Sequence, residues 1–182
     1  EVVCVEYTGF VYVFSHTGGT TTTYEFKSDL PTNIVQGSPR IADINADGVP
    51  EIIIGNQVFV LDLVNHTLKR LPVMHINYPF GRDGVSWGAD PVVVDILPNN
   101  PGKEIVAGGI VYGVNMTTGP FVLKSLNAIN SSIPLAADGP TAVADLDLDG
   151  DLDVAFSIGT RLYVWDPVGN AFLLNVPSSP AV

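Results

Sequence analysis

The residues best suited to do chemistry form an acidic loop late in the sequence, within ADLDLDGDLDVAFSI (residues 144–158). Five carboxylates fall within nine residues there, and they repel one another unless a cation neutralises them. A hard cation such as Ca²⁺ takes roughly six to eight oxygen ligands, and a glycine at the sixth position permits the tight turn that gathers them. The expected ligands are the side chains of Asp145, Asp147, Asp149 and Asp153 and the backbone carbonyl of Asp151.

A second loop has the same spacing. It lies upstream in ADINADGVPEIII (residues 42–54) and carries oxygen-bearing side chains at Asp43, Asn45, Asp47 and Glu51. An EF-hand would need a glutamate at the twelfth position and flanking helices, but Ile54 and Phe156 hold the twelfth positions and both flanks are β-type. Two copies in one context favour a metal strongly over the alternative, a pair of solvated acidic turns. We therefore predict two calcium sites.

Composition and charge limit the classes of protein that fit. The chain has 182 residues, of which 46% are hydrophobic, so it can bury a sizeable core as one domain. Its 19 acidic and 8 basic residues argue against nucleic acid or an anionic membrane as a partner. Eight of the acids lie in the two loops, so much of the acidity belongs to the predicted metal sites. No apolar run is long enough to span a membrane.

An internal repeat supplies the elements that must position these loops. Acidic residues at Glu1, Glu51, Glu104 and Asp153 are separated by 50, 53 and 49 residues, and each precedes two apolar strands joined by a glycine-containing turn. A third strand follows at about 21–26, 68–73, 121–126 and 171–176, and proline-marked strands are expected at 38–44, 90–96 and 139–146. No helix is predicted.

Short strands at even spacing, about four in each repeat of roughly 40–50 residues, are typical of a β-propeller. We predict an all-β, single-domain fold over residues 1–182 with about four four-stranded blades, in repeats 1–37, 38–89, 90–138 and 139–182. Near-continuous apolar runs such as EIII and VFVLDL indicate strands covered on both faces. A β-sandwich is the alternative, but it explains neither the period nor the repeated acidic loop.

The repeats SPRIADINADGVPEIIIGNQVFVLD and PTAVADLDLDGDLDVAFSIGTRLYVWD resemble FG-GAP (VCBS-like) repeats, the blades of the propeller in integrin α-subunits. In that family the acidic loop joins the first and second strands of a blade and holds Ca²⁺. The resemblance implies that the first site also uses the carbonyl of Val49. The third loop, DILPNNPGKE (residues 95–104), keeps only its first and last acids and carries Lys103, so we expect it to be empty.

Two further groups of residues are candidates for binding or modification. The glycine-rich loop over residues 78–90 gathers residue types that are common in binding hot spots. An equally good interpretation is that this loop folds onto its own blade. Asparagines in Asn-x-Ser/Thr motifs are candidate glycosylation sites. The binding candidates are Tyr78, Phe80, Arg82 and Trp87, and the glycosylation candidates are Asn65, Asn115 and Asn130.

The function that these features favour is a non-catalytic, extracellular or cell-surface module that binds a protein or glycan ligand. The sequence has no nucleophile elbow, no phosphate-binding loop and no histidine pair with metal-ligand spacing, so an enzyme is not expected. Two alternatives stay open: a subunit of a filament or surface layer that pairs with copies of itself, and an accessory domain of a secreted enzyme. Residues 179–182 resemble residues 38–41, which suggests a segment of a larger propeller or strand exchange between subunits.

Overall fold

A computed structural model describes residues 2–14, 24–32, 38–55, 57–72, 90–131, 140–158 and 160–177. In these residues the chain forms fifteen strands and one single-turn helix, α1 (Leu126–Ile129). The all-β class is therefore confirmed, and α1 is an addition that the strand pattern did not predict. Among the described residues, no helix has the length and apolar character that a membrane crossing needs.

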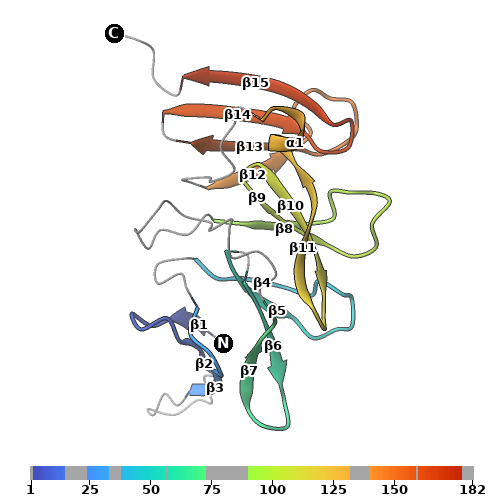
Figure 1. Cartoon of the computed structure of the whole chain (residues 1–182). Helices are drawn as coiled ribbons and strands as arrows, with labels where there is room; N and C mark the ends of the chain where they lie inside the picture. The colour runs from blue at the N-terminus through green and yellow to red at the C-terminus, as the bar shows by residue number, and fades with distance from the viewer. Residues whose placement is uncertain are drawn as a thin grey trace.

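The strands form four consecutive sets in chain order (Figure 1). The first set is β1 (Val2–Val5), β2 (Val11–Phe14) and β3 (Tyr24–Ser28). The second is β4 (Arg40–Ala42), β5 (Glu51–Ile54), β6 (Gln57–Asp62) and β7 (Thr67–Arg70). The third is β8 (Val92–Val94), β9 (Glu104–Ala107), β10 (Ile110–Asn115) and β11 (Gly119–Ser125). The fourth is β12 (Thr141–Ala144), β13 (Asp153–Ile158), β14 (Arg161–Asp166) and β15 (Ala171–Pro177).

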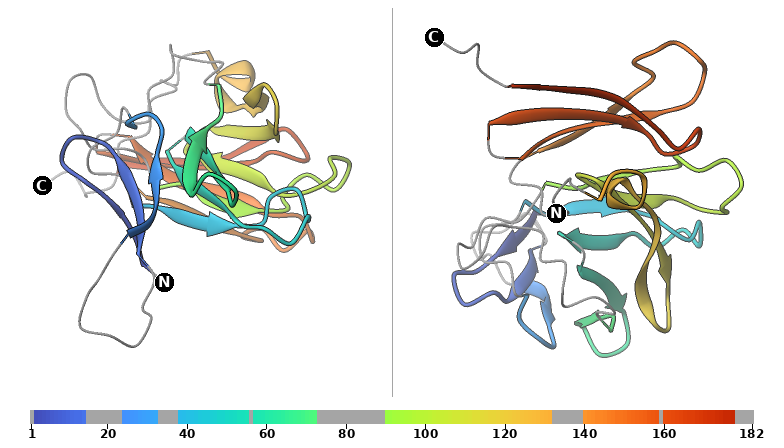
Figure 2. Two further views of the ribbon diagram at one scale, coloured as in Figure 1. Left: turned by 90° about the horizontal axis from the view of Figure 1, so that it is seen from below. Right: turned by 45° about the horizontal axis from the view of Figure 1, so that its top comes forward.

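Neighbouring strands within each set are antiparallel. The third set lies between the second and the fourth, and the first set lies beside the second (Figures 1 and 2). The third and fourth sets are separate four-stranded sheets. The first and second sets instead share one curled seven-stranded sheet, because β3 pairs in parallel with β7. The described residues thus form three sheets rather than four separate blades, and these sheets do not close into a ring.

The junction between β3 and β7 is short. It joins Lys27 to Thr67 and Ser28 to Leu68, and the Asp29 amide continues it by donating to the Leu68 carbonyl at 2.9 Å. The Asp29 carboxylate also accepts from the Arg70 amide at 3.0 Å. Two outer strands therefore pair edge to edge, which satisfies backbone groups that separate blades would leave unpaired.

The core consists of two hydrophobic clusters, one on each side of the second set. Side chains alternate along a strand, so successive residues of β5 face opposite sides. Ile52 and Ile54 pack with the first set, whereas Ile53 packs with the third and fourth sets. All of β5 and all of β9 are buried, as the continuous apolar runs predicted.

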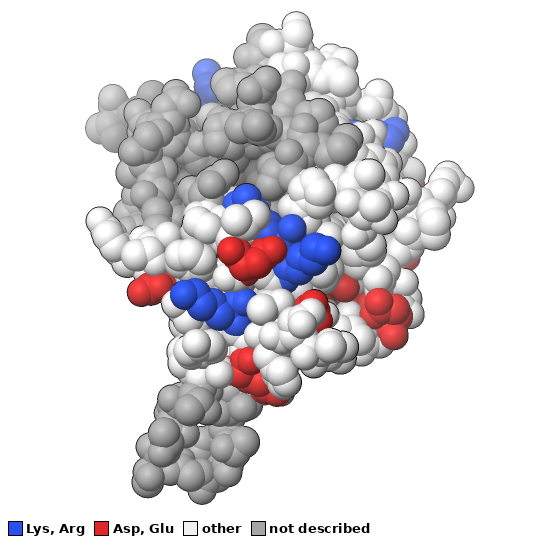
Figure 3. Space-filling view, turned by 60° about the horizontal axis from the view of Figure 1, so that its bottom comes forward, with Lys and Arg blue, Asp and Glu red and all other residues white. Residues whose placement is uncertain are grey.

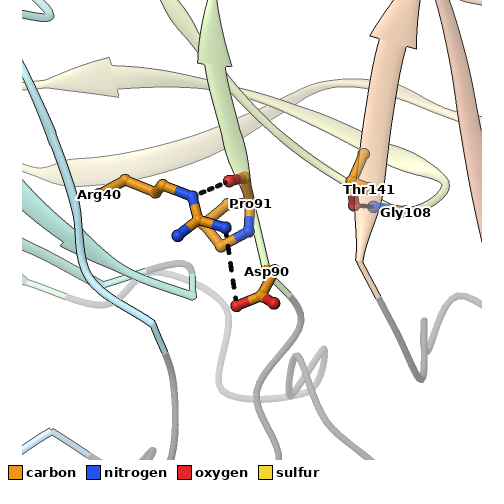
Figure 4. A network of polar contacts seen from close by, with 5 residues as sticks. All are labelled: Arg40, Asp90, Pro91, Gly108 and Thr141. Carbon is orange, nitrogen blue, oxygen red and sulfur yellow. Dashed lines mark hydrogen bonds and ion pairs between the residues drawn. The ribbon is translucent and has the colours of Figure 1, made fainter.

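Polar contacts tie the first strands of neighbouring sets together (Figure 4). Arg40 of β4 donates through Nε to the Pro91 carbonyl at 2.9 Å, and its guanidinium lies 3.8 Å from the Asp90 carboxylate. The Thr141 amide donates to the Asp90 carbonyl at 3.2 Å, and the Thr141 hydroxyl accepts from the Gly108 amide at 2.8 Å. These contacts fix where β4, β8 and β12 lie, and the acidic loops follow β4 and β12 directly.

Candidate metal centres

The two predicted metal loops lie at equivalent places, between β4 and β5 and between β12 and β13. Most of their internal hydrogen bonds recur at the same positions, but Asp43 Oδ1 also accepts from the Asp47 amide at 3.1 Å, whereas Asp145 Oδ1 has no partner. The first carboxylate of each loop accepts from the amide of the glycine five residues on, at 2.9 Å from Gly48 to Asp43 and 3.2 Å from Gly150 to Asp145. The third and fifth positions each accept from the amide two residues later. The sequence repeat is therefore also a repeat of loop geometry.

The backbone dihedrals of the two loops agree as well. Ala46 and Leu148 have φ of 60° and 65°, and the glycines that follow have φ of 88° and 99°. A positive φ is uncommon for residues other than glycine, so its recurrence at the same position marks a specific, shared turn. A Cβ atom at Gly48 or Gly150 would meet nothing within 4 Å, so the backbone conformation rather than space favours glycine there.

The second loop gathers three carboxylates. One oxygen from each of Asp145, Asp147 and Asp149 lies within 4.8 Å of the others. The second oxygen of Asp145, Oδ1, is buried and has no hydrogen-bond partner. The pKa of Asp147 is raised, first by partial desolvation and then by neighbouring carboxylates such as Asp149, although a backbone hydrogen bond lowers it. An unpartnered acceptor beside clustered like charges fits a bound cation, since hard cations are held by carboxylate and carbonyl oxygens.

The first loop has three acidic side chains where the second has five. Asn45 occupies the position of Asp147, and its amide donates to the Asp47 carboxylate at 2.9 Å. This contact partly relieves the repulsion that the second loop retains. The pKa of Glu51 is raised, chiefly by burial and also by the charges of Asp47 and Asp43.

The acidic residue at the ninth position of each loop was predicted only as a metal ligand, but it also has a structural role. Glu51 and Asp153 are 3% and 1% exposed, and each accepts from the amide next to the first ligand, at 2.9 Å from Ile44 and 2.7 Å from Leu146. Each thereby clamps the end of one strand to the start of the next. The residue type does not reveal this role, but the recurrence of an acid at the start of each second strand could have suggested it.

The third loop has the same clamp with a different partner. Glu104 is fully buried, and its Oε2 accepts from the amides of Ile96 and Leu97 at 2.9 and 3.3 Å. The Asn100 side chain donates to the other oxygen, Oε1, at 2.6 Å. Protein donors thus occupy both oxygens of this carboxylate. The role of Asn100 was missed, because an asparagine in a loop rich in Asn and Pro gives no distinctive signal.

No protein-family model matches this chain, and no curated protein matches it significantly. The resemblance to FG-GAP repeats therefore rests on the repeat and its loops.

The other candidate residues have mixed outcomes. Tyr78, Phe80, Arg82 and Trp87 lie outside the described residues. The candidate glycosylation residue Asn65 lies in the turn between β6 and β7, whereas Asn115 is the last residue of β10, just before the equivalent turn. The Asn65 side-chain amide donates to the Asp62 carboxylate at 2.7 Å, whereas the Asn115 side-chain oxygen accepts from the Thr117 backbone amide at 2.9 Å. Asn130 directly follows α1, and its backbone amide donates to the Leu126 carbonyl at 2.9 Å.

A groove of about 550 Å³ lies beside the first metal loop. The first loop, the third loop and the β10–β11 hairpin form its walls. Its lining includes Asn45, Asn100, Lys103, Asn115 and Phe121.

On the face shown in Figure 3, Lys and Arg side chains lie next to Asp and Glu side chains, so that face carries mixed charge despite the formal net charge of −11.

Proposed function

We propose that this chain is a calcium-stabilised β-propeller segment of the FG-GAP type, which acts as a non-catalytic, extracellular module for binding a protein or a glycan. One observation carries the calcium sites: two loops 102 residues apart (Asp43 to Asp145) share the same left-handed turn and the same hydrogen bonds. In the second loop, carboxylate oxygens that bond backbone amides leave Asp145 Oδ1 for a cation. The four consecutive sets of antiparallel strands, which recur at even spacing in the sequence, support the propeller as the finer description of the fold.

Calcium would be held by the same five positions in each loop. In the first these are Asp43, Asn45, Asp47, Glu51 and the Val49 carbonyl, and in the second Asp145, Asp147, Asp149, Asp153 and the Asp151 carbonyl. The cation would neutralise the clustered charge and pin the turn between two strands. Extracellular modules commonly bind Ca²⁺ with dissociation constants of about 0.1–1 mM, so such sites would fill outside the cell and not in the cytosol.

Isothermal titration with Ca²⁺ tests this proposal. We expect two sites per chain, and at a free concentration of 100 times the dissociation constant each site adds about 2.7 kcal/mol to the free energy of unfolding. Asp47→Ala and Asp149→Ala should each remove one site. Asp95→Ala in the third loop is the matched control and should leave both. A wild-type protein that binds no calcium would overturn the proposal, and a site lost in the control would show that the third loop also binds.

The groove beside the first loop supports the binding role. Its volume lies within the range of about 300–1,000 Å³ typical of ligand sites. Amide groups, the Lys103 ammonium and the Phe121 ring are suited to a polar ligand with an apolar face, such as a sugar. A glycan array probed with the wild-type chain and with Phe121→Ala tests this. Binding that Phe121→Ala leaves unchanged would place the ligand elsewhere.

A subunit of an extracellular filament is the second candidate, and one observation favours it. Within the described part of the chain, β1 pairs on one side only, with β2, whereas β5, β9 and β13 each also pair with a preceding first strand. An unpaired edge accepts strands from other chains. A synthetic peptide of residues 38–45, which contains β4, should bind this edge. No binding of the peptide would argue against strand exchange.

A further inference from the structure

The groove beside the first metal loop has a charge opposite in sign to that of the chain as a whole. Among the described residues that line it, Lys103 is the one charged residue, although the chain has 19 acidic and 8 basic residues. Lys103 is exposed, and no carboxylate of the described residues lies within ion-pair distance of its ammonium. The groove therefore offers an unpaired cation to a ligand.

Two asparagines of the lining have one side-chain group engaged and one left for a ligand. The Asn100 side-chain amide donates to Glu104 at 2.6 Å, which leaves its oxygen as an acceptor. The Asn115 side-chain oxygen accepts from the Thr117 amide at 2.9 Å, which leaves its NH₂ group as a donor. Their internal bonds hold both side chains in place, so the groove presents a fixed acceptor and a fixed donor.

The Phe121 ring supplies the apolar part of the lining. It lies against Gly113, its pairing partner across β10 and β11, where a Cβ atom would come within 2.7 Å of its Cζ. The absence of a side chain at Gly113 thus makes room for the ring. An aromatic ring beside a donor and an acceptor suits a sugar, which has apolar C–H faces and hydroxyl edges. The Lys103 ammonium adds a preference for a sugar that carries a carboxylate.

The groove and the first metal loop share a segment of backbone. Ile44, Asn45 and Ala46 belong to the loop and also line the groove. The Ile44 carbonyl accepts from the Lys103 amide at 3.1 Å, and the Ile44 amide donates to the Glu51 carboxylate at 2.9 Å. One residue therefore connects the lysine of the groove to an acid of the metal loop.

The charges of the loop affect the same ligand. Asn45 of the lining stands between Asp43 and Asp47, and Glu51 is the third acid of the loop. These carboxylates would repel an anionic sugar in the groove, whereas a divalent cation in the loop would offset two of their three negative charges. Calcium in the loop would thus favour the anionic sugar, and the sugar would favour calcium.

We infer that the groove binds a sugar of the uronic-acid class through Lys103, and that this binding is positively coupled to calcium in the first loop. The inference rests on the proposed function, because it assumes the first calcium site and a ligand in the groove, and it adds the class of sugar and its regulation. Coupling between two binding sites is reciprocal and typically amounts to about 5–150-fold. The second loop, between β12 and β13, does not line the groove and has no part in the coupling.

The experiment compares two probes, methyl glucuronide and methyl glucoside, of which the first carries a carboxylate in place of a hydroxymethyl group. Ligand-observed NMR titrations measure both dissociation constants for the full chain, in calcium and in chelator. Lys103→Gln removes the ammonium and keeps the backbone amide that bonds Ile44. Lys69→Gln is the matched control, because Lys69 is exposed in β7 and does not line the groove. Circular dichroism checks that each variant is folded.

In calcium, we expect the wild type and Lys69→Gln to bind methyl glucuronide about tenfold more tightly than methyl glucoside, because the ammonium pairs with the carboxylate. Lys103→Gln should remove this preference. Chelator should weaken glucuronide binding to the wild type at least about fivefold. In Asp47→Ala, which lacks the first calcium site, calcium and chelator should give the same affinity. If this variant misfolds, the wild type in the two buffers still decides.

The reciprocal effect is measured on calcium. Methyl glucuronide should strengthen calcium binding at the first site by the same factor. Isothermal titration of Asp149→Ala, which keeps only the first site, measures this, and calcium titrated into the glucuronide alone is the blank.

Two results would overturn the inference and leave the calcium sites standing: equal affinity for the two probes, or a glucuronide affinity that calcium does not change. A chain that binds calcium but neither probe would also overturn it, while the glycan array tests the binding role separately. A chain that binds no calcium would overturn the proposed function and the inference together.

Discussion

In the second acidic loop, the two oxygens of the Asp145 carboxylate have different surroundings. In Asp145, Oδ2 accepts from the Gly150 amide at 3.2 Å, while the buried Oδ1 has no partner. The hydrogen bonds shape the loop without a cation, whereas the remaining oxygens repel one another. The loop is thus pre-formed but electrostatically strained, and this is the arrangement that a cation stabilises.

Replacement of Asp147 by asparagine separates these two effects. Asn45 holds the equivalent position in the first loop, so an asparagine fits this geometry. In chelator we expect Asp147→Asn to raise the melting temperature at neutral pH. The substitution removes a negative charge that is less favourable in the folded protein than in the unfolded chain. In calcium we expect roughly tenfold weaker binding at the second site, because one charged ligand is lost. Scanning calorimetry in both buffers measures the effects.

The pH dependence of the difference in melting temperature between the wild type and Asp147→Asn identifies the cause of that difference. The pKa of Asp147 is raised above its ordinary value of 3.8, so the folded state binds this proton more tightly than the unfolded state. Without calcium, this residue therefore lowers stability as the pH rises from about 3.8 through the raised pKa. Wild type and Asp147→Asn should melt alike at lower pH and diverge above it. A difference that is the same at every pH would assign the effect to packing instead.

Glu104 gives a prediction that does not involve calcium. Glu104→Ala removes the acceptor for three donors, two of them backbone amides in a buried region. Each buried donor left unpaired costs about 1–3 kcal/mol, so we expect a loss of at least about 2 kcal/mol in the free energy of unfolding. Urea denaturation with and without calcium measures it. A loss that calcium alters would contradict the view that protein donors satisfy this carboxylate.

At the level of the elements, the sequence predicted the strands well and their association less well. Apolar runs bounded by Gly, Pro and acidic loops placed β5, β9, β13 and their hairpin partners, because local patterning decides where such strands begin and end. The parallel pairing of β3 with β7 was not predicted. It depends on backbone groups at two outer edges, and side-chain patterns carry little information about those.

The same division applies to the candidate sites. Asp, Asn and Gly at fixed spacing predicted both acidic loops, since their chemistry is local. Glu51 and Asp153 were interpreted as metal ligands alone, and Glu104 as part of an empty loop. The partners of all three carboxylates include backbone amides, which no sequence pattern marks. The Asn100 contact to Glu104 likewise depends on how the third loop folds. The sequence thus predicted residues whose chemistry depends on local spacing, but it did not predict side-chain contacts to the backbone.

Contacts between first strands make a prediction at this scale. Thr141 is 8% exposed, and its hydroxyl accepts from the Gly108 amide. Thr141→Val keeps the shape but leaves that amide without an acceptor, which should cost about 1–3 kcal/mol. Asp90→Ala is the comparison, because its ion pair with Arg40 is partly exposed and should contribute less than about 1 kcal/mol. Equal losses in the two variants, measured by urea denaturation, would contradict this ranking.

For the whole molecule, the repeated strand set is the unit that builds the core. Ile52 and Phe59 of the second set pack in one cluster with the first set, whereas Ile53 packs in the other cluster with the third and fourth sets. The second set therefore contributes to both clusters. The aromatic residue paired with the first apolar residue of a strand is at most 1% exposed in the second, third and fourth sets, whereas Phe14 of the first set is half-buried.

The equivalent residues Phe14 and Phe59 allow a direct test of this difference in burial. Phe59→Ala creates a cavity in a closed core and should cost about 3–5 kcal/mol in the free energy of unfolding. Phe14→Ala should cost much less, because the Phe14 side chain is only half-buried. Urea denaturation of the two variants measures both losses. A Phe14→Ala loss as large as that of Phe59→Ala would contradict this ranking.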